Sequence, residues 1–382
     1  MKKSEYLYLD HAATTPMREI AIKAFIDAEH EGFANSSGSH NLSRKAKNIL
    51  EESRETIAGI FGVAPNEIIF TSGGTEADNW SIKTLFNKNT HLDSNLVTTN
   101  IEHEAVLASA QWIKDNEYDV VFAKCLINGE LDKNSFLNAV NKNTLIASAM
   151  WANNETGIIQ PIKEISNEVK KINSKTLFHS DVVQAVVSDR IDFHKEGIQS
   201  AAISAHKIGG PKGIGAMFLS SEFKLPSMLH GGKQELERRA GTVNVAGAAS
   251  FASALQEQQN NFDDEILIMT KEKKEFEQIV KDNFKVKIIG EDENRLPHIS
   301  NIQFEKVNSE ILMVDLDLNG LGVSRGSACA SGAQKPSHVL EAMGINKEYI
   351  NNHLRFSFGW STSLGDGKKA AKILLNSLRK IS

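Results

Sequence analysis

The chain has 382 residues, of which 41% are hydrophobic and 24% charged, so its composition is that of a globular protein and excludes long disorder. Its 43 basic and 48 acidic side chains give a net charge of −5 at pH 7, which argues against direct nucleic-acid binding because that needs a strongly basic face. We expect no membrane span, because no uncharged apolar run approaches about 18 residues. Two cysteines, Cys125 and Cys329, exclude a disulfide framework and a four-thiolate metal site. We expect no signal peptide, no metal and a cytoplasmic location.

Short apolar runs alternate with helical patterns over the first two thirds of the chain. The predicted strands are residues 67–71, 95–99, 119–123, 144–150, 176–179, 200–204 and 213–219. A helix is predicted over residues 75–83, and Pro161 is expected to open another, because proline suits the first helical turn. This alternation predicts an α/β fold with a mainly parallel seven-stranded sheet covered by helices. Ligands of such sheets bind beyond the carboxyl ends of the strands.

The chain changes character near residue 255. Residues 256–280 are charged and helical, and residues 285–289, 299–304 and 354–357 have the pattern of strands. We therefore predict a large domain over residues 14–255. A smaller α+β domain is predicted from residues 1–13 and 256–382, and it carries a loop around Cys329.

Thr71-Ser72-Gly73-Gly74-Thr75-Glu76 lies between a predicted strand and a predicted helix. Glycines let backbone N–H groups face a ligand, and a helix start carries partial positive charge, so this segment is a candidate anion site. The alternative is an ordinary glycine turn that caps a helix. Neither of the glycine motifs typical of dinucleotide or nucleoside triphosphate binding occurs here.

Two charged residues follow apolar strands. Burying the Asp181 carboxylate there costs free energy unless it meets a positive partner such as a protonated pyridine nitrogen. The alternative is that Asp181 is the N-cap of a helix. Lys207 is followed by a glycine-rich stretch, and a lysine in a dry site becomes an amine nucleophile able to form Schiff bases; the alternative is a surface lysine. An anion site, a pyridinium partner and an imine-forming lysine are together the anchors of pyridoxal phosphate.

Two further residues have contrasting environments. Cys329 lies among Ser, Gly and Ala residues 324–332, which favours an exposed, mobile loop and a reactive thiol, whereas Cys125 lies in an apolar run and is expected to be structural.

Arg355 lies in an apolar strand, where it would bind either a substrate carboxylate or a structural acid.

In this order, these pieces resemble the pyridoxal-phosphate cysteine desulfurases of the NifS/IscS type, within the class V aminotransferase-like group. The resemblance covers nearly the whole chain. Its most specific stretches are residues 8–16, 71–76, 153–157, 204–213, 230–232, 240–242, 325–331 and 355–357. It implies a fold type I aminotransferase-like architecture, pyridoxal 5'-phosphate as cofactor of the large domain, and a homodimer.

The resemblance also implies roles for individual residues. Lys207 would form the Schiff base, Asp181 would pair with the ring nitrogen, and His103 would stack on the ring and move protons. The other implied cofactor contacts are Gly74, Thr75, Asn154, Gln184, Ser204 and His206, with Thr242 contributed by the partner subunit. Asn154, Arg355 and Asn35 would hold the substrate carboxylate.

The implied reaction converts L-cysteine to L-alanine. Cys329 would take the sulfur as a persulfide and pass it to an acceptor, either an iron–sulfur scaffold or a protein of tRNA or thiamine thiolation. One alternative is another pyridoxal-phosphate enzyme, such as an aminotransferase or a selenocysteine lyase. The other is a non-catalytic assembly partner that kept the fold.

Overall fold

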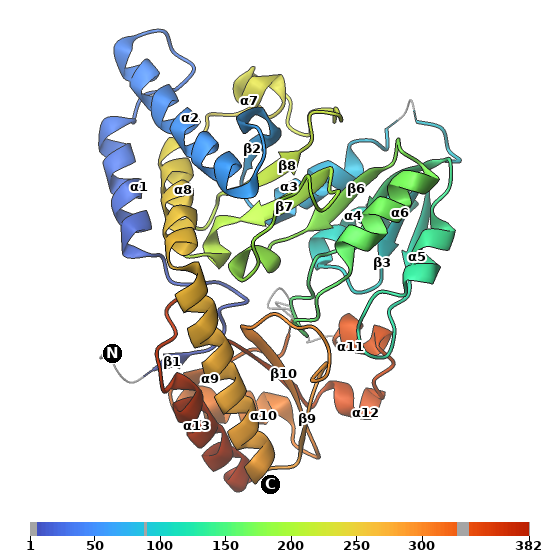
Figure 1. Cartoon of the computed structure of the whole chain (residues 1–382), viewed down its shortest axis with the longest axis vertical. Helices are drawn as coiled ribbons and strands as arrows, with labels where there is room; N and C mark the ends of the chain where they lie inside the picture. Colours follow the sequence, from blue (N-terminus) through green and yellow to red (C-terminus); the bar gives the residue numbers. More distant parts are fainter. Residues whose placement is uncertain (1–5, 88–89, 327–335, 382) are drawn as a thin grey trace.

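The computed structural model describes residues 6–87, 90–326 and 336–381 (Figure 1). Its strands are β1 (Leu7–Tyr8), β2 (Ile68–Thr71), β3 (Asn95–Thr99), β4 (Asp119–Ala123), β5 (Thr144–Ser148), β6 (Leu177–Asp181), β7 (Ser200–Ser204), β8 (Gly215–Leu219), β9 (Val286–Ile288), β10 (Ile299–Phe304), β11 (Leu321–Gly322) and β12 (His353–Ser357). Its α-helices are α1 (Glu19–Glu31), α2 (Asn41–Phe61), α3 (Gly74–Lys83), α4 (Glu104–Asp115), α5 (Lys133–Ala139), α6 (Ile162–Ile172), α7 (Gln234–Glu237), α8 (Val245–Asn260), α9 (Phe262–Asn283), α10 (Ser309–Leu318), α11 (His338–Ala342), α12 (Lys347–Ile350) and α13 (Asp366–Ile381). The 3₁₀ turns are η1 (Pro65–Glu67), η2 (Ala185–Val187) and η3 (Ala205–Lys207).

The largest sheet has seven strands in the order β2-β8-β7-β6-β5-β3-β4. β8 runs antiparallel to β2 and β7, and the remaining pairs are parallel. The predicted mainly parallel sheet is therefore present, with small shifts at its ends. β5 ends at Ser148 because the Met150 N–H donates to Glu102 Oε1 instead of to a neighbouring strand. β8 begins at Gly215 because Gly213, at φ +80°, still belongs to the preceding turn.

Helices cover both faces of this sheet (Figure 1). One face packs against α2, α6 and α8 in a core that includes Ile57, Ile165 and Phe251. The other face packs against α3 and α4, where Trp80 and Val106 are almost fully buried. The strands inside the sheet can be apolar on both sides because helices exclude water from both faces, whereas the edge strand β4 keeps exposed residues.

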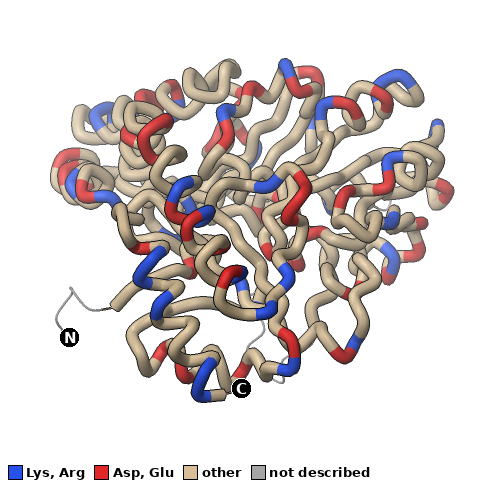
Figure 2. The backbone as a smooth tube through the Cα atoms, turned by 60° about the horizontal axis from the view of Figure 1, so that its bottom comes forward, with Lys and Arg blue, Asp and Glu red and all other residues tan. Residues whose placement is uncertain are grey.

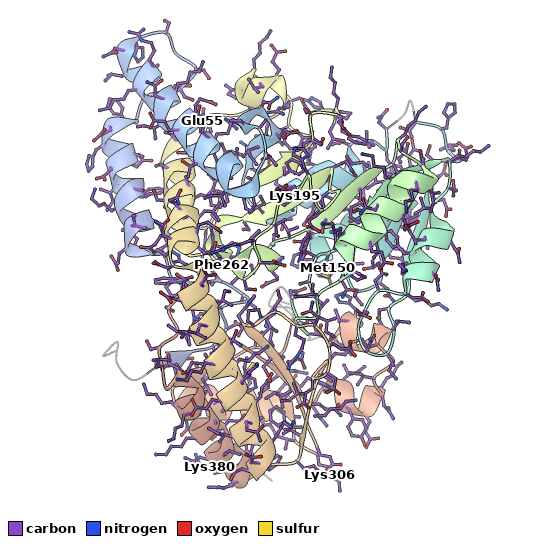
Figure 3. All side chains as sticks on the ribbon, viewed as in Figure 1. Glu55, Met150, Lys195, Phe262, Lys306 and Lys380 are labelled. Carbon is purple, nitrogen blue, oxygen red and sulfur yellow. The ribbon has the colours of Figure 1, made fainter. Side chains whose placement is uncertain are left out.

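A second, smaller layer lies below the large sheet in Figure 1. Its antiparallel strands, in the order β12-β10-β9, share a core with α9, α10 and α13. Helix α9 follows α8 directly, and Figure 3 labels Phe262 at this junction. Leu9 packs in the smaller core and Ala12 in the larger one, so the N-terminal segment also passes between them. The division into domains at residues 14 and 255 stays a prediction.

Charged residues of both signs are intermixed along the backbone in the view of Figure 2, in keeping with the small net charge. Among the described helices, none combines the length and the apolar character that crossing a membrane requires.

Candidate active site

A pocket of about 200 Å³ lies at the carboxyl ends of β6 and β7, beside the first turns of α3 and α4. Predicted site residues that line it are Gly74, Thr75, His103, Asn154, Asp181, Gln184, Ser204, His206, Lys207 and Arg355. They come from segments far apart in the sequence. The rule that ligands bind beyond the carboxyl ends of parallel strands therefore accounts for where these residues meet.

One end of the pocket is formed by the start of α3. Within the described chain, no side chain caps this helix at Gly73, so its first N–H groups remain available to an anion. A Cβ on Gly74 would lie 2.8 Å from Val183 Cγ2, so this close packing requires glycine. Thr75, Ser204 and Lys212 also line an adjoining open hollow, which supplies hydroxyl groups and a positive charge. The arrangement suits a phosphate group.

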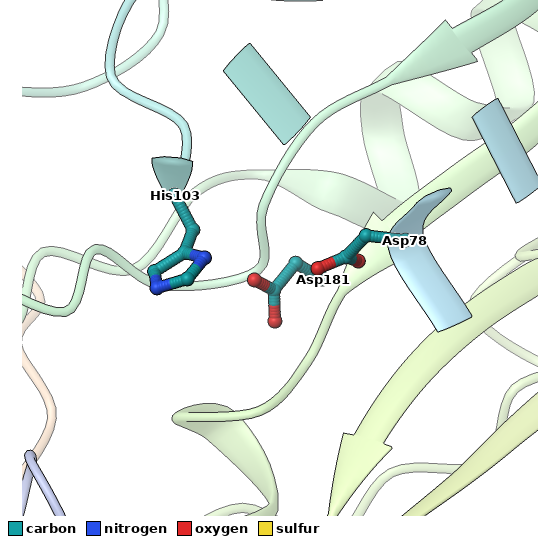
Figure 4. Close-up of side chains that lie close together, drawn as sticks. All are labelled: Asp78, His103 and Asp181. Atoms are coloured by element: carbon teal, nitrogen blue, oxygen red, sulfur yellow. The ribbon is translucent and has the colours of Figure 1, made fainter. Parts of the chain in front are cut away.

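The pocket also contains Asp181, His103 and Asp78; one nitrogen or oxygen atom from each side chain lies within 4.8 Å of the others. Figure 4 shows the Asp181 carboxylate between the imidazole of His103 and the carboxylate of Asp78. Burial raises the pKa of Asp181, while the positive charges of His103 and Lys207 lower it. The Val183 N–H donates to Asp181 Oδ1 at 2.9 Å and fixes the carboxylate. The expectation of no metal stays a prediction.

Lys207 ends the 3₁₀ turn after β7. Its Nζ donates to the carbonyl oxygens of Ala12 at 2.6 Å and Ala13 at 2.8 Å. Gln184 Nε2 also donates to the Ala12 carbonyl, at 2.9 Å. The N-terminal segment therefore closes one wall of the pocket and holds both side chains in place.

His206, beside Lys207, is held by the same N-terminal segment. Its Nδ1 lies 3.1 Å from Thr14 Oγ1. Burial, helped by the charges of Lys207 and Lys212, lowers the pKa of His206 to about 4. It is therefore neutral at physiological pH and can offer a phosphate a hydrogen bond without a charge.

Arg355 enters the pocket from β12 of the smaller layer and is 2% exposed. It donates to the Asn154 carbonyl at 2.9 Å and forms an ion pair with Asp10 at 2.8 Å. Its Nε is buried without a hydrogen-bond partner within the described chain. Asp10 is therefore the structural acid that the sequence analysis gave as one of two possible partners of Arg355. The Nε–H group of Arg355 is still available to a ligand.

Among the described residues, two predicted site residues, Asn35 and Thr242, do not line this pocket. Asn35 is exposed, and its Oδ1 accepts from the Ser37 N–H at 2.9 Å. Thr242 is exposed beyond α7. Cys329 lies outside the described residues. Cys125 is half-buried, and burial raises the pKa of its thiol.

Some pocket residues were missed by sequence reasoning. Asp78 lines the pocket from α3, and its spacing of three residues from Thr75 places both on one helix face, a signal that was available. Ala12 and Ala13 contribute through backbone carbonyls, which no side-chain pattern reveals.

Comparison with known proteins gives consistent matches over the chain. Residues 7–366 match the family model for Aminotransferase class-V. Cysteine desulfurase IscS of Dictyoglomus turgidum is 36% identical over 376 residues, covering 98% of this chain and 95% of that protein. The structure of a NifS-like protein superposes with a TM-score of 0.92 at 28% identity, covering 98% of this chain and all of the other. SspA in complex with cysteine superposes with a TM-score of 0.81 at 29% identity, covering 94% and 100%.

Proposed function

The chain belongs to the class-V aminotransferase family and, within it, to the cysteine desulfurases, and from this membership we propose that it converts L-cysteine to L-alanine and transfers the sulfur to Cys329. The predicted family, enzyme class and fold type are confirmed. The substrate is supported by the cysteine that SspA binds. One observation carries the proposal: Lys207, Asp181 and the uncapped start of α3 line one pocket.

The residues of this pocket fit pyridoxal 5'-phosphate, the cofactor expected for this family. Lys207 would hold it covalently, and Asp181 would pair with its ring nitrogen. The start of α3, with Thr75, Ser204 and His206, would hold its phosphate, and Gln184 its ring hydroxyl. When bound, the cofactor supplies an electron sink for the substrate carbon that carries the amine.

Residues of the chain would carry out the remaining steps. Arg355 and Asn154 would hold the substrate carboxylate, helped by Asn35, and the released Lys207 amine would take the proton from the substrate Cα. His103 would move a proton within the pocket. The Cys329 thiolate would bond to the substrate sulfur as the Cβ–S bond breaks, leaving that electron pair on the three-carbon fragment, which gains protons to become alanine.

A homodimer is proposed because Thr242 is implied to act in the partner subunit's site. Thr242 is exposed, as is the nearby Leu236, at 66%. Ile20, Ile26 and Phe33 are further apolar side chains exposed between 45% and 68%. Sedimentation analysis should give twice the 42.0 kDa mass of the chain. Delivery of the sulfur to an iron–sulfur scaffold or a thiolation protein, and the cytoplasmic location, are proposed with it.

Lys207→Ala tests the proposed function. We expect the cofactor absorbance of the purified protein and alanine production from L-cysteine both to be lost, because the amine that holds the cofactor is gone. Lys195→Ala is the matched control, since Lys195 is exposed and pairs only with Asp192 at the surface among the described ion pairs. Retention of the lysine-bound absorbance in Lys207→Ala would show that another lysine holds the cofactor.

A further inference from the structure

Two buried carboxylates lie side by side in the pocket. Asp78 is 1% exposed and Asp181 is 7% exposed, and their oxygen atoms lie within 4.8 Å (Figure 4). The other titratable groups that act on this pair are Glu102, His103, His179 and Lys207. Two carboxylates this close in a dry site do not both ionise. Burial disfavours each anion, and the negative charge of one carboxylate disfavours ionisation of the other. The location of the single charge therefore matters.

A chain of hydrogen bonds behind Asp78 can run in either direction, and one of the two directions places a proton on Asp78. Ser81 Oγ donates to Met217 Sδ at 3.3 Å, and a thioether can only accept. In that direction the Ser81 hydrogen goes to the thioether, and Ser81 accepts from Ser200 Oγ, which lies 2.6 Å away. Since the hydroxyl hydrogen of Ser200 is used in this bond, its oxygen accepts from His179 Nδ1 at 3.3 Å.

The imidazole of His179 links this chain of hydrogen bonds to Asp78. Its ring is fully buried, and burial lowers the pKa of His179 to about 3, so the ring is neutral and carries one proton, on Nδ1. Its Nε2 is then an acceptor, and the partner at 3.1 Å is Asp78 Oδ1. An acceptor nitrogen at that distance pairs with a donor, so in this direction of the chain Asp78 carries the hydrogen.

We infer that Asp78 is a neutral acid that donates to His179 Nε2, so that the negative charge of the carboxylate pair resides on Asp181. Burial, with the charges of Asp181 and Glu102, raises the pKa of Asp78 well above its usual range, in agreement with this direction. The inference rests on the proposed function where it assigns Asp181 to the cofactor ring nitrogen. Asp78 thus acts as a positioning residue through Asp181.

The first test follows the histidine proton directly. In the holoenzyme prepared with nitrogen-labelled histidine, nuclear magnetic resonance should show the His179 proton on Nδ1 and a lone pair on Nε2. His179→Gln identifies the signal. A proton on both nitrogens, or on Nε2 alone, would overturn the assignment.

The second test uses the pH dependence of unfolding. A carboxyl whose pKa is raised by folding stabilises the protein most below its unfolded pKa, and loses that contribution as pH rises toward the folded pKa. Asp78→Asn removes this loss and keeps a donor to His179. The melting temperature of Asp78→Asn minus that of the parent should therefore increase by about 2 °C or more as the pH rises from about 5 to about 8.

Asp78→Leu is the comparison variant, because it leaves His179 Nε2 without a donor and should melt below Asp78→Asn at every pH. If Asp78 were instead an anion paired with a charged His179, Asp78→Asn would be less stable than the parent at neutral pH, and the difference would shrink on acidification. That result would overturn the inference. Both measurements are independent of turnover, so a protein that fails to desulfurate cysteine contradicts the proposed function and not this assignment.

Discussion

Asp181 combines a buried position with a charge that the proposed chemistry needs. Burial raises its pKa, and His103 and Lys207 oppose that rise. Asp181→Asn keeps the shape and removes the charge, so the ring nitrogen of the cofactor would lose its partner. We expect alanine production to fall by several decades, on the order of 5 kcal/mol or more, while some cofactor stays bound.

Steady-state kinetics together with the absorbance of the bound cofactor separate these two effects. Asp119→Asn is the control, since Asp119 is exposed at the start of β4 and outside the pocket. Near-normal turnover in Asp181→Asn would remove Asp181 from the site.

Glu102 is a second buried acid near Asp181, and it predicts a pH effect on stability. Burial raises the pKa of Glu102 to about 8, although Thr99 and the Met150 N–H donate to its Oε1. Its contribution to stability is complete below its unfolded pKa and is lost as pH rises through about 8. The free energy of unfolding of Glu102→Gln minus that of the parent should therefore increase by up to about 1.4 kcal/mol per pH unit between the unfolded pKa and about pH 8.

Urea unfolding of Glu102→Gln and the parent at several pH values measures this difference. A constant difference between about pH 5 and pH 8 would show that Glu102 ionises in the folded protein as it does in the unfolded chain.

At the scale of elements, the short helix α7 is strained. Glu235, Leu236 and Glu237 have φ values of 50°, 58° and 63°, a left-handed conformation that costs side-chain-bearing residues of order 1–3 kcal/mol each. Glu235 compensates: it forms a buried ion pair with Arg54 at 2.7 Å and accepts from the Phe70 N–H at 2.9 Å. This carboxylate thereby ties the turn to α2 and β2.

Glu235→Gln should lower the free energy of unfolding by roughly 3–5 kcal/mol, because buried Arg54 would lose its buried partner and keep only Glu51, whose side chain is 43% exposed. Glu237→Gln lies in the same turn but breaks an exposed pair with Lys233, so it should cost at most about 1 kcal/mol. Urea denaturation measures both variants. Equal losses would show that the buried pair does not hold the turn.

The regular elements were predictable where one physical rule governs them. Apolar runs bounded by turn residues predicted β3, β4 and β7 with their observed ends. β3 and β7 are buried on both faces, whereas the edge strand β4 is partly exposed. α7 was not predictable, since its left-handed backbone depends on the tertiary contact between Glu235 and Arg54.

The candidate site was predictable for side chains that follow strands or begin helices. Asp181 and Lys207 could be identified because charge at or just after the end of an apolar strand is costly without a function. The predicted strand 176–179 was too short, since Asp181 is the last residue of β6. The Ala12 carbonyl, which accepts from both Lys207 and Gln184, could not be, since backbone groups leave no sequence pattern. The proton chain from Ser81 to Asp78 likewise needs the packing of α3 on β6 and β7.

At the scale of the whole molecule, the pocket joins distant parts of the chain. Arg355 from the smaller layer contacts Asp10 of the N-terminal segment and the Asn154 carbonyl of the larger layer. Figure 3 labels Met150, another pocket residue, close to where the two layers meet. A substrate in this pocket would therefore contact residues of both layers.

Cys329 and Cys125 provide the matched pair that tests this arrangement. Cys329 belongs to a segment rich in Ser, Gly and Ala that lies outside the described residues, and its reactive thiol stays a prediction from the sequence. Cys125 is half-buried, and burial raises the pKa of its thiol, so the reactive thiolate is disfavoured there. We expect Cys329→Ser to keep the bound cofactor and to lose alanine and sulfide production almost completely. Cys125→Ser should change little beyond a small packing cost.

Mass spectrometry after incubation with L-cysteine and alkylation locates the transferred sulfur. One extra sulfur on Cys329 and none on Cys125 is the expected result, because sulfur transfer requires the thiolate and access to the substrate. The cofactor absorbance of Cys329→Ser controls for loss of the fold. If this variant desulfurates cysteine at the parental rate, no persulfide on Cys329 is needed for turnover. The chemistry of a selenocysteine lyase or an aminotransferase would then describe the pocket better.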